Sequence, residues 1–192
     1  MNTPLSPELR FAALAESGRN VFLTGPAGTG KSFNIDRFTK EHPDTEVTAS
    51  TGIAALNIDG MTVHRWSGML IGPKQGQSFD DFFRHLSRDQ RPGIRAAFNR
   101  VRRARRLVID EISMLPGRLL DYLEYHCRAI RQDDRPFGGI QVISTGDFLQ
   151  LPPVRTRTYL PYDWAFEAEA WGAAGFETVE LTRSRRPDDP VF

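Results

Sequence analysis

The sequence lacks most of the features that secreted, membrane and metal-binding proteins require. Its single cysteine, Cys127, has no partner for a disulfide bond within the chain, and we interpret it as a small buried hydrophobe. Its four histidines lack metal-ligand spacing. No apolar run approaches the roughly 20 residues of a membrane-spanning helix, and the first ten residues lack the apolar core of a signal peptide. These absences predict a reduced, cytoplasmic protein without a membrane partner.

The chain also has little net charge. The formal value is +1 over 192 residues, which by itself gives no indication of a nucleic-acid partner. However, nine arginines lie between Arg84 and Arg106. A basic segment in a neutral domain is typical of a surface that binds phosphates, and it is also typical of a solvated helix face. The composition leaves both interpretations open.

The most informative segment is GPAGTGKS at 25–32, which fits the phosphate-binding pattern G-x-x-x-x-G-K-[ST]. Glycines allow the backbone to curl around an anion, Lys31 supplies a positive charge for the β- and γ-phosphates, and the Ser32 hydroxyl is a ligand for Mg²⁺. An apolar run at 21–23 precedes the segment and a helical pattern at 32–38 follows it, which is the setting that this loop needs. An ordinary glycine-rich turn is the alternative. The residues expected to bind the nucleotide are Gly25, Pro26, Ala27, Gly28, Thr29, Gly30, Lys31 and Ser32.

Alternating strand and helix patterns predict an α/β domain with a mostly parallel sheet covered by helices on both faces. Short segments rich in β-branched residues predict strands at 20–24, 45–49, 106–110, 140–145 and 177–181. Helical patterns occupy 6–17, 31–40, 52–58 and 117–132. The stretch 69–100 breaks the alternation, and we interpret it as a small basic insertion with short helices near 80–88 and 93–103.

Two further segments place polar side chains at the predicted ligand-binding edge of this sheet. The apolar strand in LVIDEISM ends at Asp110 and Glu111, and we expect Asp110 to hold Mg²⁺ and Glu111 to act as general base. An acidic helix cap is the alternative there. The segment STGDFLQLPPV brings Asp147 and Gln150 to the same edge, where the Gln150 amide would contact the γ-phosphate or the attacking water. Its alternative is an aspartate turn closed by prolines.

Taken in order, the motifs resemble the first motor domain of the Pif-one and RecD type of superfamily-1 DNA helicase. The resemblance covers nearly the whole chain, and its most specific piece is FGGIQ joined to GDFLQLPPV. It implies a RecA-like P-loop NTPase domain that uses ATP and Mg²⁺ for 5′→3′ movement on single-stranded DNA in repair, recombination or replication. The segments that carry it are GPAGTGKS, TASTGIAALNIDGMTVHRWSG (48–68), LVIDEISML, PFGGIQVISTGDFLQLPPV (136–154) and LTRSRR (181–186).

The resemblance also implies roles for individual residues. Lys31, Glu111, Gln150 and Arg186 match the catalytic positions, with Gln150 as the γ-phosphate sensor and Arg186 reaching the phosphates from the far edge of the domain, while Ser32 and Asp110 match the metal ligands. The matching DNA-binding positions are Ser50, Thr51, Gly52, Thr62, His64 and Trp66. Trp66 would stack on a base. Core packing is the alternative for Trp66 and His64.

The sequence departs from the family in a few places. No glutamine precedes Gly25 to read adenine, so base selectivity stays open. Pro187 replaces the glutamine usual after Arg186, which leaves Arg185 and Arg183 as alternatives to Arg186. A second RecA-like domain with an arginine finger is expected after Phe192, so the isolated first domain should hydrolyse ATP very slowly. We also expect the protein to be a monomer. The stretch 69–100 matches a wedge-like subdomain. The competing functions are a loader or packaging ATPase and an ATP- and DNA-binding module that does not move.

Overall fold

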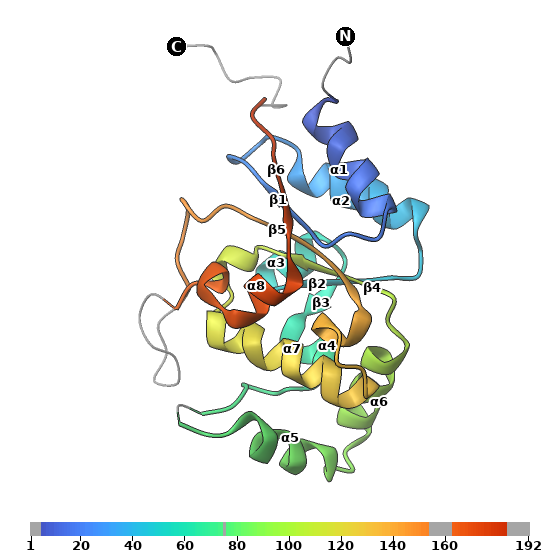
Figure 1. Ribbon diagram of the computed structural model, residues 1–192, viewed down its shortest axis with the longest axis vertical. Coiled ribbons are helices and arrows are strands. Elements are labelled where there is room, and N and C mark those ends of the chain that lie inside the picture. The colour runs from blue at the N-terminus through green and yellow to red at the C-terminus, as the bar shows by residue number, and fades with distance from the viewer. Residues whose placement is uncertain (1–4, 75, 154–162, 184–192) are drawn as a thin grey trace.

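The computed structural model describes residues 5–74, 76–153 and 163–183, and its centre is one six-stranded sheet with the order β3-β2-β4-β5-β1-β6 (Figure 1). Every neighbouring pair of strands is parallel. The strands are β1 (Val21–Thr24), β2 (Thr45–Ala49), β3 (Met61–Thr62), β4 (Arg106–Asp110), β5 (Gln141–Gly146) and β6 (Glu177–Glu180). The five predicted strands are therefore confirmed. The sixth, β3, was not predicted, because two residues are too few to form a periodic pattern.

The predicted helices are also confirmed, and two short ones are added. The helices are α1 (Pro7–Glu16), α2 (Lys31–Glu41), α3 (Gly52–Asn57), α4 (Val63–Ser67), α5 (Phe79–Ser87), α6 (Pro92–Arg103), α7 (Gly117–Arg131) and α8 (Glu169–Ala174). Three 3₁₀ turns lie at η1 (Ile112–Met114), η2 (Pro136–Gly139) and η3 (Ala165–Glu167). Neither α4 nor α8 was predicted, because helices of five and six residues complete less than two turns.

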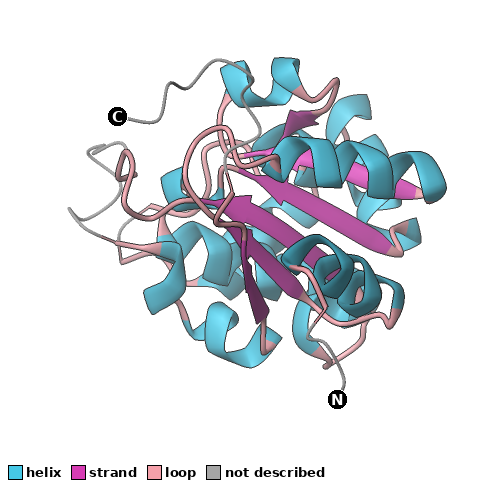
Figure 2. Cartoon of the chain, turned by 90° about the horizontal axis from the view of Figure 1, so that it is seen from above, coloured by secondary structure: helices cyan, strands magenta, loops and turns pink. Residues whose placement is uncertain are grey.

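Helices cover both faces of the sheet, as predicted (Figure 2). Alternate side chains of the strands point to opposite faces. Leu107 and Ile109 of β4 belong to the larger hydrophobic cluster, which packs against α4, α6, α7 and α8. Val108 of the same strand belongs to the smaller cluster, with Phe11 of α1 and Phe38 of α2. The sheet is thus buried on both sides, and its edge at the carboxyl ends of the strands is left for ligands.

The stretch 69–100 forms the two expected helices, α5 and α6. The α6 residues Ala97 and Val101 are fully buried, and Val101 belongs to the larger cluster. Arg131 of α7 fastens the end of α6, because its Nη1 group donates to the carbonyl oxygens of Val101, Arg102 and Ala104 at 2.9–3.1 Å. A wedge function for this stretch stays a prediction. Within the described residues, no helix combines the length and the apolar character needed to cross a bilayer.

Candidate functional site

The loop between β1 and α2 has the positive backbone φ angles that its glycine-rich sequence pattern allows. Gly25, Gly28 and Gly30 have φ values of 141°, 81° and 92°, in the region that favours glycine. A Cβ atom on Gly25 would also overlap the carbonyl oxygen of Leu181, the residue that follows β6. Helix α2 begins at Lys31, directly after the loop. The geometry is therefore that of a loop curled at a helix N-terminus, rather than an ordinary turn.

Lys31 folds back over this loop. Its Nζ group donates to the carbonyl oxygens of Gly25 at 2.6 Å and Pro26 at 3.2 Å. Thr29 adds a second hydrogen bond within the loop, since its hydroxyl donates to the Pro26 carbonyl oxygen at 2.9 Å. Ser32 is exposed on the first turn of α2. An anion that enters the loop therefore meets an ammonium group already held at its rim.

Asp110 and Glu111 leave the end of β4 at the same edge of the sheet. Asp110 is buried, and its Oδ1 atom accepts a hydrogen bond from the hydroxyl of Thr145 on the neighbouring strand β5. Glu111 is partly buried and has a left-handed backbone, with φ 53° and ψ 44°. Burial raises the pKa of Glu111, the charges of Asp110 and Asp147 raise it further, and Lys31 opposes them. These interactions require the four charged groups to lie near one another.

Gln150 and Asp147 form one hydrogen-bonded turn after β5. Gln150 Nε2 donates to Asp147 Oδ2 at 2.9 Å, and the Leu149 N–H donates to Asp147 Oδ1 at 3.0 Å. The bond from Gln150 is the main reason why the pKa of Asp147 is lowered. The aspartate turn considered from the sequence is thus present. Gln150 is exposed beside it, in the loop that also brings Asp147 towards Lys31.

The oxygen donors at this edge suit Mg²⁺. Among the described residues, no group of three or more histidine, cysteine, aspartate or glutamate side chains forms a metal-binding cluster. Mg²⁺ keeps several waters and binds through one or two carboxylates together with substrate phosphates. The Ser32 hydroxyl and the Asp110 carboxylate would hold it in that way. The residues present therefore fit the metal, with the nucleotide completing its ligands.

The hydroxyls of the expected DNA-binding segments have defined bonds. Thr51 accepts from the Ala54 N–H at 3.2 Å and caps α3, which begins at Gly52. Thr62 accepts from the Arg65 N–H at 3.2 Å and caps α4. The Ser50 hydroxyl donates instead to the Glu111 carbonyl oxygen at 2.7 Å.

The expected stacking of Trp66 on a base does not fit this structure. Its side chain is 0% exposed, and its indole N–H donates to Glu46 Oε2 at 3.1 Å. A buried ring whose only polar atom is bonded has no face to offer to a base, so core packing, the alternative, applies. His64 is partly buried, and burial lowers its pKa. Arg186 lies outside the described residues.

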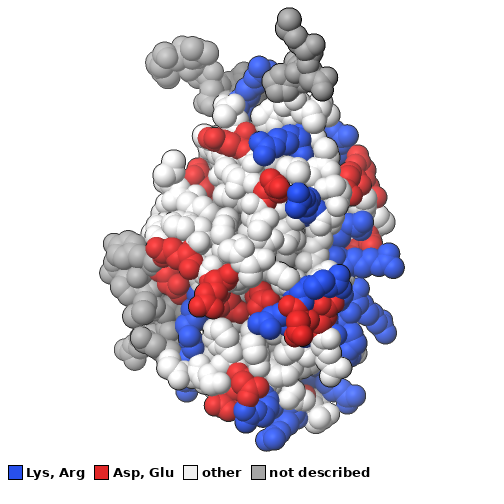
Figure 3. Space-filling view, viewed as in Figure 1, with Lys and Arg blue, Asp and Glu red and all other residues white. Residues whose placement is uncertain are grey.

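Several residues of the arginine-rich stretch are held by bonds within the domain. Arg84 and Arg91 pair with nearby aspartates, and Arg106 pairs with Asp44 at 2.8 Å. Arg100 donates to the carbonyl oxygens of Arg65 and Trp66 at 2.7 and 3.1 Å, so it stabilises the end of α4. Figure 3 shows acidic and basic side chains intermixed on one face of the molecule. Part of the basic composition therefore serves the fold rather than a phosphate surface.

Two residues whose hydrogen bonds support Asp110 and the start of α7 were not identified from the sequence. The Thr145 hydroxyl donates to Asp110. This contact is a consequence of the parallel register of β4 and β5, which places Ile109 beside Ser144 and so brings the next residues together. Asp163 caps the start of α7: its carbonyl oxygen accepts from the Gly117 N–H at 3.0 Å, and its Oδ2 atom accepts from the Arg118 N–H at 2.9 Å. No signal predicts a cap that comes from 45 residues further along the chain.

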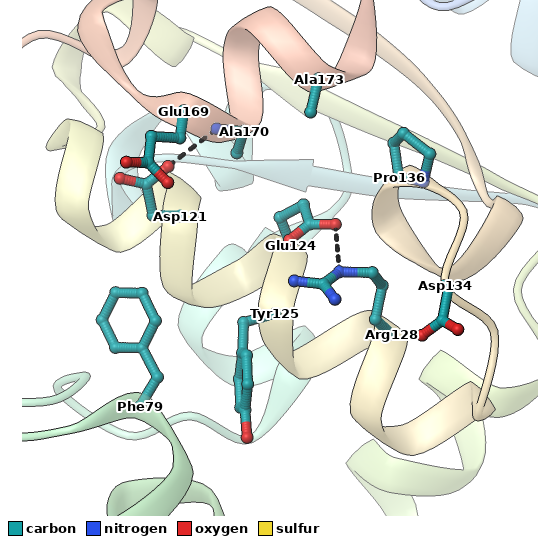
Figure 4. Close-up of a pocket in the computed structure, with 10 residues that line it drawn as sticks. All are labelled: Phe79, Asp121, Glu124, Tyr125, Arg128, Asp134, Pro136, Glu169, Ala170 and Ala173. Atoms are coloured by element: carbon teal, nitrogen blue, oxygen red, sulfur yellow. Dashed lines mark hydrogen bonds and ion pairs between the residues drawn. The ribbon is translucent and has the colours of Figure 1, made fainter.

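A separate pocket of about 320 Å³ lies along α7 and is bordered by residues of α5, η2 and α8 (Figure 4). Its wall includes Asp121 and Glu169, and Arg128, which donates to Glu124 Oε1 at 2.6 Å. The Ala170 N–H donates to Asp121 Oδ1 at 2.9 Å. None of the residues expected to bind nucleotide, metal or DNA lines this pocket, so it is distinct from the edge at which Lys31 and Asp110 meet.

Comparison with known proteins places these features in context. The chain matches the family model described as PIF1-like helicase over residues 8–190. It is 44% identical over 177 residues to the ATP-dependent DNA helicase PIF1 of Homo sapiens, covering 91% of this chain and 26% of that protein. It is 42% identical over 191 residues to the ATP-dependent DNA helicase Pif1 of Bdellovibrio bacteriovorus, covering 98% of this chain and 41% of that protein.

Solved structures give the same result for the fold. The Pif1 helicase of Candida albicans superposes with a TM-score of 0.79 at 36% identity, covering 95% of this chain and 40% of that one. The Bacteroides Pif1 helicase in complex with ADP-AlF3 and ssDNA superposes with a TM-score of 0.81 at 30% identity, covering 99% of this chain and 44% of that one. These matches confirm the resemblance drawn from the motifs and the RecA-like fold. The chain spans about a quarter to two fifths of the length of these curated relatives.

Proposed function

Since the chain belongs to the PIF1-like helicase family, we propose that it forms the ATP-hydrolysing motor domain of a DNA helicase that moves along single-stranded DNA. The observation that carries this proposal is the strand order β4-β5-β1, which places Asp110 and Glu111, Asp147 and the Lys31 loop at the carboxyl ends of three neighbouring parallel strands. These residues come from three separate loops. A parallel sheet brings such loops together at the carboxyl ends of its strands.

Lys31 is the first group to act. Its ammonium group exchanges the carbonyl oxygens of Gly25 and Pro26 for the β- and γ-phosphates of ATP. This exchange holds the nucleotide without leaving a buried charge unpaired at any stage. Ser32 and Asp110 would hold Mg²⁺, which neutralises charge on the phosphate oxygens when it is bound.

Glu111 acts next, as the general base for water. Its raised pKa brings it closer to the operating pH, which makes it a better proton acceptor than an ordinary glutamate. Gln150 contacts the γ-phosphate or the attacking water, and its bond to Asp147 links it to the end of β5. The expected arginine contacts, from Arg186 and from a second RecA-like domain, would complete the charge stabilisation.

Single-stranded DNA is the proposed partner. The related Bacteroides helicase was solved with ssDNA. In this chain, Thr51 and Thr62 accept backbone bonds with their hydroxyl oxygens, and each has its hydroxyl proton to give to a phosphate. Gly52 and His64 lie beside them in the sequence, and we propose the same surface for all four. We further propose 5′→3′ movement, by a monomer, in DNA repair, recombination or replication.

The test is ATP binding and ssDNA-stimulated hydrolysis by matched variants. Lys31→Ala should lose binding of a fluorescent ATP analogue by at least about tenfold, because the phosphates lose their cation. Glu111→Gln should bind the analogue normally and lose hydrolysis. Lys40→Ala is the control, since Lys40 lies on the same helix and pairs only with exposed Asp36 at 2.7 Å among the described residues. Normal hydrolysis by Lys31→Ala or Glu111→Gln would contradict the proposed site.

A further inference from the structure

Ser50 lies directly beside Glu111 because of the register between two parallel strands. Ala49, the last residue of β2, lies opposite Asp110, the last residue of β4. The Ser50 N–H continues this ladder by donating to the Asp110 carbonyl oxygen at 3.1 Å. The Ser50 hydroxyl then donates to the Glu111 carbonyl oxygen at 2.7 Å. Ser50 is therefore bonded to the backbone of both acidic residues of the site.

Glu111 has a backbone conformation that needs such support. Its φ of 53° lies in the left-handed region, which residues other than glycine rarely adopt. Its carbonyl oxygen accepts hydrogen bonds from the Ser50 hydroxyl at 2.7 Å and from the Met114 N–H at 3.0 Å. Strained backbone of this kind persists where surrounding groups hold it, and it is concentrated at active sites. The Ser50 hydroxyl is one of two groups that fix the peptide after Glu111.

The same bond removes Ser50 from the set of phosphate donors. A hydroxyl group has one proton, and the proton of Ser50 is already given to Glu111. Thr51 differs, because its oxygen accepts from Ala54 and its own proton is left for a phosphate. The sequence assigned both residues to DNA, but their bonds separate them.

We propose that Ser50 is a positioning residue for the general base Glu111 and not a ligand of the DNA backbone. This inference rests on the proposed function, and it deepens it. Ser50 is covalently joined to Thr51, so a strand bound at Thr51 and the base at Glu111 are separated by one residue and one hydrogen bond. The backbone at the end of β2 thereby links the proposed DNA contact at Thr51 to the proposed general base Glu111.

The experiment compares Ser50→Ala and Ser50→Thr with a matched control. Ser17→Ala is the control, because the Ser17 hydroxyl also donates to a carbonyl oxygen at 2.7 Å, that of Leu14, at the end of α1. For each variant we would measure the single-turnover rate of ATP hydrolysis, the melting temperature, and the affinity for ssDNA as a function of salt concentration. Ser50→Ala should lower the hydrolysis rate about tenfold or more, with unchanged ATP affinity, melting temperature and salt slope. Ser50→Thr and Ser17→Ala should hydrolyse ATP at nearly the original rate.

Backbone NMR of Glu111 supplies a readout that does not depend on activity. Ser50→Ala should change the HN–Hα coupling and the Cα shift of Glu111, as its backbone leaves the left-handed region. If Glu111→Gln hydrolyses ATP at the original rate, the proposed function fails, and this NMR comparison alone decides whether Ser50 holds the Glu111 backbone. An unchanged Glu111 spectrum overturns the inference. So does a Ser50→Ala variant with normal hydrolysis and a shallower salt slope, or a rate loss that simply follows the melting temperature.

Discussion

The Nζ group of Lys31 donates a hydrogen bond of 2.6 Å to the carbonyl oxygen of Gly25, so the phosphate loop is closed by its own lysine. The bond joins the first residue of the motif to the seventh. It keeps the ammonium group satisfied and holds it at the rim that a phosphate must approach. An anion that enters the loop, as we propose for the phosphates of ATP, would therefore meet this ammonium group without a large movement of the side chain.

Gly25→Ala should damage the loop more than any surface change. The added methyl group would overlap the Leu181 carbonyl oxygen, and φ at this position is 141°. We expect the free energy of unfolding to fall by about 2 kcal/mol or more, since strain and overlap add. Nucleotide affinity should fall with it. Urea denaturation and titration with a fluorescent ATP analogue measure the two effects, and Gly172→Ala, where a Cβ meets nothing within 4 Å, is the control.

Thr145→Val should weaken the metal-dependent part of nucleotide binding. It removes the hydroxyl that donates to buried Asp110 while keeping the shape of the side chain. An unpaired buried acceptor costs about 1–3 kcal/mol, which should appear as lower stability and as a higher Mg²⁺ requirement for ATP binding. Thr145→Ser should restore both. Titration of ATP binding against Mg²⁺ is the measurement, and an unchanged Mg²⁺ requirement in Thr145→Val would contradict the prediction.

The stability of the domain should depend on buried His126 at mildly acidic pH. The His126 ring bonds the Ser67 carbonyl oxygen at 2.9 Å and the Tyr122 hydroxyl at 3.2 Å, and burial lowers its pKa from 6.5 to about 4. Between those values the unfolded chain binds a proton that the folded chain excludes. The contribution is therefore present above pH 6.5 and is lost as the pH falls towards 4, by up to about 3 kcal/mol.

Carboxylates also titrate below pH 5, so the His126 contribution must be isolated by comparison. His126→Gln replaces the imidazole with a neutral amide that does not titrate. The free energy of unfolding, measured by urea denaturation between pH 7 and 4.5, should fall less steeply with acidification in this variant. Parallel pH profiles for the two proteins would contradict the assignment.

Arg131→Ala should loosen α6 from the rest of the domain. The Arg131 guanidinium donates to the carbonyl oxygens of Val101, Arg102, Ala104 and Gly138 at 2.5–3.1 Å. Bonds from a charged donor contribute about 1.5–3 kcal/mol, so we expect a loss of roughly that size in the free energy of unfolding. Faster hydrogen exchange in α6 should accompany it.

The control for Arg131 is Arg37→Ala. Arg37 forms an exposed pair with Glu41 at 3.2 Å, and such pairs contribute a few tenths of a kcal/mol. Its removal should leave the melting temperature nearly unchanged. Equal losses in the two variants would show that Arg131 has no special role at the end of α6.

Salt dependence decides between the two interpretations of the arginine-rich stretch. If arginines of this stretch bind phosphates, log K for single-stranded DNA should fall steeply as log salt rises. Arg100→Gln should lower stability rather than this slope, because Arg100 bonds the backbone of α4. Fluorescence anisotropy with a labelled oligonucleotide at several salt concentrations measures the slope. A flat response would leave the solvated helix face as the better interpretation.

The sequence predicted the sheet well because its strands depend on local patterns, and the nucleotide site proposed from similar local patterns stays a prediction. Strands such as 106–110 were found from a few β-branched residues, and the phosphate loop was found from its glycines and Lys31. The positions of Asp110 and Glu111 followed from one rule, that the loops of a parallel sheet meet at one edge. These inferences need no knowledge of which side chain touches which.

The remainder depends on contacts between distant residues. Trp66 was expected at the DNA because the family resemblance places an aromatic residue there, but the larger core cluster buries it completely. Ser50 was expected to contact a DNA phosphate, but its hydroxyl donates to the carbonyl oxygen of Glu111, which lies 61 residues later in the chain. The cap that Asp163 gives to α7 has no local signal either. Side-chain partners of this kind are fixed by packing, which a single sequence does not reveal.

Leu181 gives the domain a mechanical property. Its N–H donates to the Thr24 carbonyl oxygen at 2.8 Å, and its own carbonyl oxygen lies against Gly25. The polypeptide thus leaves the sheet while still touching the first residue of the phosphate loop. A pull on the chain beyond Leu181 is transmitted to that loop without an intervening element. A displacement of Leu181 would therefore shift Gly25 as well, so the exit from the sheet and the shape of the loop at 25–32 cannot change independently.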